Sequence, residues 1–338
     1  MRQFSMPRRH PTFGLTLLCA AALAACGGGG SDSGSTATTA DEATAYAANA
    51  TLMAGDASTA LDAGMLAAQS VVTAHAAALS ESDRATALAA SDGEMARPAA
   101  VTSVQVPCGG GGTATLSITG GTAQSVLNGQ FDTGEVYQLV YANCRGVFGA
   151  VSLNGTLTLT VQNATATDLS LGLVVNNLVA TLPRGSVTLA GSTTRELSIS
   201  TVAGGATQLT GRFASPSLTL TTQYNTRTSV FALTAVDITR QGTWLNGILQ
   251  SSSINGSYTL AATLPNGWFN YTVATQGGVN YSASGVPTSG SWTITLPKTL
   301  IGVTVANATA TITIDDGKDG TIDRTIIVPV ARLQSDAG

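Results

Sequence analysis

The last two-thirds of the chain alternate apolar residues with residues that carry a hydroxyl group. In residues 156–161, TLTLTV places leucine and valine on one side of an extended chain and threonine on the other. The alternation returns at 197–199, 218–220 and 292–296. It is typical of antiparallel strands with one face in a core and one in water. Residues 102–333 are therefore expected to form a mainly β, large antiparallel meander, shaped as a sandwich, a strongly curved sheet or a barrel.

A short phrase recurs within this region: Gly, then Ser or Thr, any residue, Thr, and Leu or Ile. It begins at Gly112, Gly155, Gly185, Gly256 and Gly290. Its spacing is irregular, which argues against a solenoid with a fixed repeat. We interpret each occurrence as a turn followed by a strand.

An alanine-rich segment at residues 40–92 has helical periodicity instead. One stripe recurs at steps of three and four: Tyr46, Ala50, Met53, Ala57, Leu61, Met65, Ala68, Val72, His75 and Leu79. Gly55-Asp56 predicts a break between two helices. Because alanine dominates the stripe, we expect it to pack closely against another surface. Residues 93–101 are expected to be a linker, and 334–338 a tail.

The first residues have the order of an export signal. Arg2, Arg8 and Arg9 precede an apolar run at 13–23 that is too short to span a bilayer. The run ends in Leu23-Ala24-Ala25-Cys26, which resembles the lipobox of bacterial lipoproteins. The resemblance implies that residues 1–25 are removed and that Cys26 carries lipid, palmitate included. In that family Asp after the cysteine implies the inner membrane. Gly27 therefore implies a lipid anchor in the outer membrane, followed by a flexible tether at 26–39.

The charges are few and unevenly placed. The formal net charge is −4, and 10% of residues are charged. Nine acids and only two bases fall between residues 32 and 97, whereas the region from 98 onward is balanced. The sequence shows no basic stretch to pair with phosphates, so nucleic acid is not an expected partner.

The cysteines predict one disulfide. Cys19 belongs to the signal and Cys26 to the anchor, which leaves Cys108 and Cys144 as a pair in an oxidising compartment. No CxxC spacing favours a metal or redox site.

Catalytic signals are sparse. His75 is the one histidine outside the signal, and Gly-x-Ser-x-Gly is absent. A carboxylate-based hydrolase remains an alternative. Its candidate acids are Asp132, Glu135, Asp168, Glu196 and Asp237.

An aspartate-rich segment at 315–323 admits two interpretations. Asp315, Asp319 and Asp323 resemble positions 1, 5 and 9 of extracellular and EF-hand-like calcium loops. The segment departs from that pattern, because Gly317 stands at position 3, Lys318 adds a positive charge and Ile326 replaces the acid at position 12. The preferred interpretation is a hairpin turn, with calcium as the alternative. No other cofactor is expected.

Aromatic residues concentrate between 244 and 292. They are Trp244, Tyr258, Trp268, Phe269, Tyr271, Tyr281 and Trp292. They form either a core with a cross-strand ladder or a ligand surface. Trp268 and Phe269 are adjacent, so in a strand their side chains face opposite sides.

Together these observations favour an outer-membrane lipoprotein with a non-enzymatic binding or structural role in the cell envelope. Its expected partners are the membrane, through the lipid, and an envelope protein, a glycan or an apolar ligand. A carrier that holds a lipid-like ligand in a β-cavity is a second hypothesis, resting on analogy of fold. The carboxylate hydrolase is a third.

Overall fold

The computed structural model describes residues 39–40, 42–44, 46–47, 102–121, 131–146, 151–265 and 267–335. The signal, Cys26, the tether, His75, the linker and most of the alanine-rich segment lie outside these residues. The predictions made for them therefore stay predictions.

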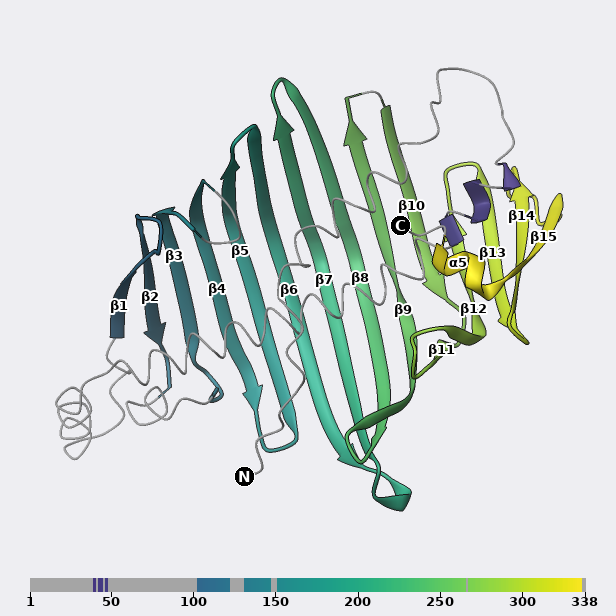
Figure 1. Ribbon diagram of the computed structural model, residues 1–338, viewed down its shortest axis with the longest axis horizontal. Helices are drawn as coiled ribbons and strands as arrows, with labels where there is room; N and C mark the ends of the chain where they lie inside the picture. The colour runs from purple at the N-terminus through teal and green to yellow at the C-terminus, as the bar shows by residue number, and fades with distance from the viewer. Residues whose placement is uncertain are drawn as a thin grey trace.

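The described chain is dominated by one antiparallel sheet of fifteen strands (Figure 1). The strands are β1 (Thr102–Pro107), β2 (Thr113–Thr119), β3 (Val136–Cys144), β4 (Ser152–Ala164), β5 (Asp168–Leu182), β6 (Gly185–Thr201), β7 (Thr207–Tyr224), β8 (Arg227–Leu245), β9 (Ile248–Leu264), β10 (Gly267–Thr275), β11 (Val279–Ser282), β12 (Pro287–Thr295), β13 (Thr299–Ala306), β14 (Thr309–Asp316) and β15 (Arg324–Pro329). A short 3-10 turn, η2 (Ala203–Gly205), joins β6 to β7, and helix α5 (Val330–Ser335) follows β15.

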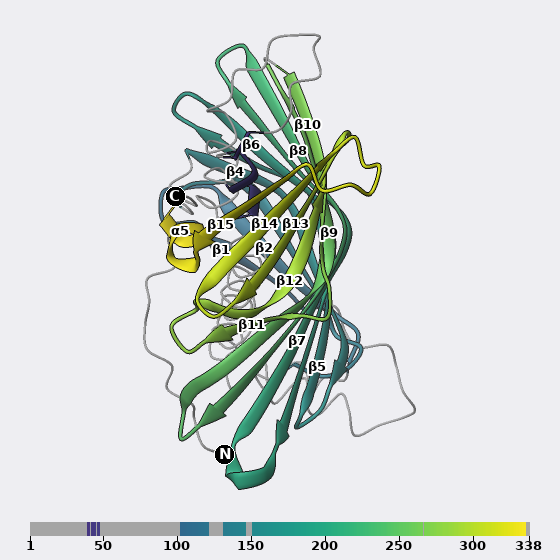
Figure 2. The same ribbon diagram turned by 90° about the vertical axis from the view of Figure 1, so that its right-hand side faces the viewer.

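The strands pair in the order of the sequence, with one exception. β11 leaves the path and pairs with β9 and β12, while β10 pairs directly with β12. This topology confirms the predicted antiparallel meander. Of the three expected shapes, the described residues form a single open sheet with β1 and β15 at its edges, and Figure 2 shows that it is strongly twisted and curved.

The two faces of the sheet follow the alternation in the sequence. On the inner face, Ile294, Ile301 and Ile314 lie side by side across β12–β14 and are fully buried. On the outer face, threonine hydroxyls pair across strands, as in the 2.8 Å hydrogen bond between Thr259 and Thr272. The apolar residues therefore build the core and the hydroxyl-bearing residues build the solvated face.

Bulges bend the long strands. The register of β8 and β9 shifts between Thr234 and Asp237, and Ala235 adopts a positive φ of 50°. Gly256 lies opposite with a φ of +148°, and a Cβ there would clash with the Asp237 carbonyl. Gly155 stands in the same relation to a bulge at Asn177. The prediction that these glycines begin turns is therefore wrong, because they lie inside strands where the sheet bends.

The described helical residues, 40, 42–44 and 46–47, pack on the inner face. Thr39 begins the helix with a capping box: its hydroxyl accepts from the Glu42 N–H, and the Glu42 carboxylate accepts from the Thr39 N–H. Ala43 and Ala47 are fully buried in the main core, and the rings of Tyr46 and Tyr271 meet edge-on at 5.5 Å. The start of the alanine-rich segment thus packs closely through Ala43 and Ala47; of the predicted stripe only Tyr46 is described, so the packing of the stripe stays a prediction.

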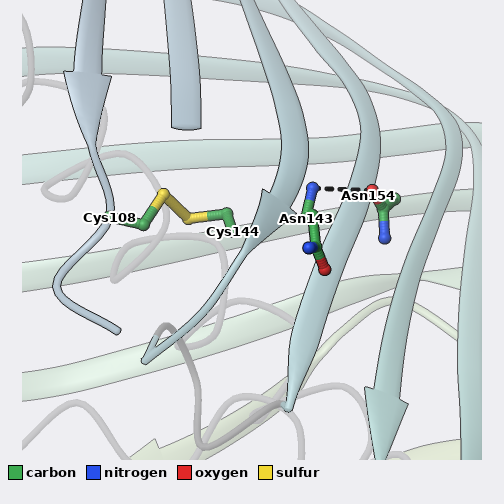
Figure 3. The surroundings of a disulfide bond; sticks show 4 residues. All are labelled: Cys108, Asn143, Cys144 and Asn154. Atoms are coloured by element: carbon green, nitrogen blue, oxygen red, sulfur yellow. Dashed lines mark hydrogen bonds between the residues drawn. A yellow bond between two sulfur atoms is a disulfide. The ribbon is translucent and has the colours of Figure 1, made fainter. Parts of the chain in front are cut away.

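Cys108 and Cys144 form a disulfide, as expected (Figure 3). Cys108 follows β1 and Cys144 ends β3, so the bond joins two strands that both pair with β2. Cys144 is fully buried beside Leu153 and Ala180. Beside it, the Asn143 N–H donates to Oδ1 of Asn154 at 2.8 Å. The disulfide therefore fixes the first edge of the sheet.

Candidate functional site

A shallow hollow of about 510 Å³ lies on the outer face where β4 to β8 run side by side. Eight of its ten lining residues have polar side chains; the full lining is Asn163, Asp168, Leu169, Ser170, Glu196, Leu197, Ser198, Thr210, Arg212 and Thr239. We call this feature the outer-face hollow.

Strand register assembles the hollow from distant parts of the sequence. Ser170, Glu196, Arg212 and Thr239 occupy one row across β5–β8, each opposite the next. Neighbouring strands lie about 4.8 Å apart, so hydrogen-bonding side chains repeat at that spacing across the sheet. Phe213, which follows Arg212 in the strand, is buried in the core and fixes the outward direction of the arginine.

Arg212 organises the charges of the hollow. Its Nε and Nη2 donate to the two carboxylate oxygens of Asp237 at 2.8 and 2.9 Å, which is the bidentate geometry of a strong arginine–carboxylate pair. Its Nη1 lies 3.5 Å from Oε2 of Glu196. All three side chains are 43–55% exposed, so these pairs contribute little to stability and present a fixed polar pattern to solvent instead.

The structure brings together three of the acids that the sequence nominated for catalysis: Asp168 and Glu196 line the hollow, and Asp237 lies beside it, paired with Arg212. The hydrogen bonds and charge of Arg212 lower the pKa of Asp237. A glycoside hydrolase needs one acid whose pKa is raised so that it can donate a proton near neutral pH. The arginine acts in the opposite direction on Asp237, so this carboxyl does not fit the role of that acid.

The other nominated pair, Asp132 and Glu135, lies elsewhere. Glu135 is fully buried, where one carboxylate oxygen accepts from the Tyr137 hydroxyl and from the Asp132 backbone N–H. Burial and the Glu135 carboxylate together raise the pKa of Tyr137. These contacts hold the turn before β3 and give Glu135 a structural role.

The aromatic residues divide between core and surface. Tyr258, Tyr271, Tyr281 and Trp292 are buried in the main core, and Phe269 and Trp244 are half-buried. Trp268 is 69% exposed, on the side of β10 opposite Phe269, as the alternation of a strand requires. The seven residues thus do not form one open surface, and the core interpretation describes four of them.

Burial of these phenols makes stability sensitive to alkali. Burial raises the pKa of Tyr258 and Tyr271, and it raises the pKa of Tyr281 to about 12. The unfolded chain releases these protons near its ordinary pKa of 10, so the free energy of unfolding should fall as pH rises from about 10 to 12. Absorbance at 295 nm should show the buried phenols ionising together with loss of the circular dichroism signal. Ionisation of all tyrosines near pH 10 with the fold intact would contradict this placement.

The aspartate-rich segment is a hairpin turn between β14 and β15. The Asp315 carboxylate is buried and accepts the N–H groups of Asp319 and Gly320, whereas Asp323 accepts from the Asp316 N–H. Asp319 caps the N–H of Thr321 at 2.8 Å. In the described ranges, no three His, Cys, Asp or Glu side chains are grouped to hold a metal ion. The carboxylates named for calcium bind backbone N–H groups of the turn itself.

Calcium should therefore leave the fold unchanged. We expect the melting temperature in millimolar CaCl₂ to equal that in a chelator within error, because a ligand stabilises only when it binds the native state. Asp315→Ala should lower the melting temperature equally in both buffers, since it removes the acceptor of two N–H groups that hold the turn. A calcium-dependent rise that Asp315→Ala abolishes would restore the calcium interpretation.

Comparison with known proteins finds no family model, no curated protein and no solved structure that matches the chain. Among the described residues, no helix is both long enough and apolar enough to cross a membrane.

Proposed function

We propose that this protein is a lipid-anchored lipoprotein of the outer membrane whose β-domain binds a hydrophilic ligand without catalysis. The observation that carries the binding role is the outer-face hollow, where hydroxyls, carboxylates and Arg212 converge from five strands. The hollow lies on the opposite face from the described helical residues, of which Ala43 and Ala47 pack in the core, and from α5. Hydroxyl, carboxylate and guanidinium groups are the partners that sugar hydroxyls take, so a glycan is the ligand class that best fits the hollow.

The other hypotheses fit these contacts less well. A carrier of a lipid-like ligand needs an enclosed apolar cavity, whereas the hollow is open to solvent and most of its lining residues have polar side chains. A hydrolase needs an acid of raised pKa, whereas Arg212 lowers the pKa of Asp237.

The anchoring is tested by metabolic labelling with palmitate and membrane fractionation. The wild-type protein should incorporate label and sediment with outer membranes. Cys26→Ser should lose both properties, whereas Cys19→Ser, which alters the other cysteine of the signal region, should keep them. Label in the Cys26→Ser variant would overturn the anchor.

The binding role is tested on an array of defined oligosaccharides. We expect wild-type protein to bind a subset of them and Arg212→Gln to lose about tenfold or more in affinity, because hydrogen bonds from a charged group are the stronger ones. Asn270→Ala, an exposed outer-face change on β10, is the control and should bind normally. Failure to bind any oligosaccharide, or equal binding by Arg212→Gln, would overturn the glycan assignment.

A further inference from the structure

The two ends of the sheet differ in charge. In an antiparallel meander, alternate turns share one end, and Figure 1 shows the β5–β6, β7–β8 and β9–β10 turns together along the upper edge. By the same connectivity this end carries the connections that follow β1, β3, β5, β7, β9, β12 and β14. We call it the basic end, for the charges given next.

Arg145, Arg184, Arg227 and Lys298 lie in or directly beside four of these turns, and all four are exposed. No acid falls in those turns; the 317–323 turn alone at this end has acids, Asp319 and Asp323, beside Lys318. The connections at the opposite end, from the one that follows β2 to the one that follows β13, have no Lys or Arg in the sequence. β8 has 19 residues and β13 has 8, so the two ends lie about 60 Å apart along the longest strands and about 26 Å along the short ones, several Debye lengths in either case. The cations therefore act at one end only.

Two exposed aromatic side chains lie at the same end. Trp268 is 69% exposed just after the β9–β10 turn, and Tyr224 is 52% exposed just before the β7–β8 turn. Arg184 reaches the Tyr224 hydroxyl from the neighbouring turn at 3.4 Å. Tryptophan and tyrosine favour the headgroup level of a bilayer, and arginine and lysine favour anionic lipids there.

We propose that the basic end docks on the anionic headgroup surface of a lipid bilayer. This inference goes beyond the proposed function. It depends on the proposed lipid anchor only for the identity of the membrane that the basic end contacts. The chain between Cys26 and Thr39 spans at most about 45 Å, which is less than the length of the long strands. The described helical residues 40–47, purple in both views, lie in the upper half of the molecule with the basic end (Figures 1 and 2). The anchor therefore holds this half nearer to the membrane.

The test is co-sedimentation of the mature chain carrying Cys26→Ser with vesicles of phosphatidylcholine alone or mixed with phosphatidylglycerol. The protein without lipid should sediment with the anionic vesicles and stay in solution with the neutral ones. Each cation near an anionic membrane strengthens partitioning about fivefold, so replacing all four by glutamine should weaken it ~100-fold or more. High salt should release the wild-type chain in the same way.

A charge-matched control separates local contact from net charge. Asn246→Asp, Gln276→Glu, Ala283→Glu and Asn307→Asp together lower the net charge by the same amount in exposed turns of the opposite end. This variant should sediment far more than the glutamine variant. Equal loss in both variants, equal sedimentation with neutral vesicles, or no sedimentation of the wild type would overturn the docking surface.

Tryptophan fluorescence gives a readout that does not depend on the charge variants. Trp268 should shift to the blue on addition of anionic vesicles, and Trp268→Phe should remove the shift, because Trp292 is buried and the half-buried Trp244 lies at the opposite end of the sheet. Absence of a shift in the wild type would overturn the placement of Trp268 at the membrane. Because these experiments use the chain without lipid, their failure leaves the palmitate result intact, and failure of palmitate labelling leaves the vesicle result intact.

Discussion

Replacing Cys108 and Cys144 together by serine is expected to lower the free energy of unfolding by about 4 kcal/mol. The two residues lie 36 positions apart, and their bond restricts the unfolded chain across that loop. Within the fold, the bond ties the end of β1 to the end of β3, so its loss frees an edge of the sheet. Urea unfolding followed by circular dichroism measures the change.

Reduction provides the internal control for this result. A reducing agent should destabilise the wild-type protein by a similar amount and leave the double-serine variant unchanged. If the double-serine variant unfolds at the same urea concentration as the oxidised wild type, the disulfide does not stabilise this edge.

The second large effect is expected from Gly256→Ala, which should cost about 3 kcal/mol or more. The φ of +148° disfavours any side chain, and the new Cβ would clash with the backbone carbonyl of Asp237 in the facing strand. Relief would require β8 and β9 to separate at the bulge, where two of the longest strands pair. Thermal unfolding measures the loss.

Gly109→Ala is the matched control, because a Cβ there meets no atom within 4 Å and the φ is not positive. This change should leave stability within about 0.5 kcal/mol of wild type or raise it slightly. Equal stabilities for the two alanine variants would show that Gly256 is not required for the bend.

The fold class could be predicted because the period of two in segments such as 156–161 reports both strand geometry and burial. The bulges could not, since a glycine with positive φ serves a turn at Gly112 and a strand bend at Gly256 equally well. Both glycines precede the same hydroxyl-rich phrase. Only the pairing of strands distinguishes the two uses.

The grouping of the candidate-site residues could not be predicted from the sequence for a related reason. Arg212 lies 16 residues from Glu196 and 25 from Asp237, and their meeting depends on the register of three long strands. A shift of one residue in any pair would move Arg212 to the other face. A usable signal was present: Arg212 stands at a position where the outer face otherwise carries hydroxyls. Arg195 is the opposite case, because this arginine is buried at a position of β6 where the alternation predicts an apolar residue.

The aromatic residues show that clustering in the sequence does not predict whether a side chain lies in the core or on the surface. Their clustering in the sequence is equally compatible with a core and with a ligand surface. Tyr258, Tyr271 and Trp292 fall on the inner side of their strands, and neighbouring strands complete their burial. Trp268 falls on the outer side near a turn and stays exposed. Once the register is known, the side of the strand on which each residue falls separates the core aromatics from the exposed one.

The most direct test of the central claim is native mass spectrometry of the protein extracted from a cell envelope with its anchor intact, followed by non-reducing peptide mapping. We predict a mature chain that begins at Cys26, carries three acyl chains and yields a Cys108–Cys144 peptide pair without a bound apolar ligand. An unmodified Cys26 would contradict the lipid anchor. A co-purifying lipid-sized mass held inside the β-domain would contradict the binding role proposed for the outer face and favour a carrier.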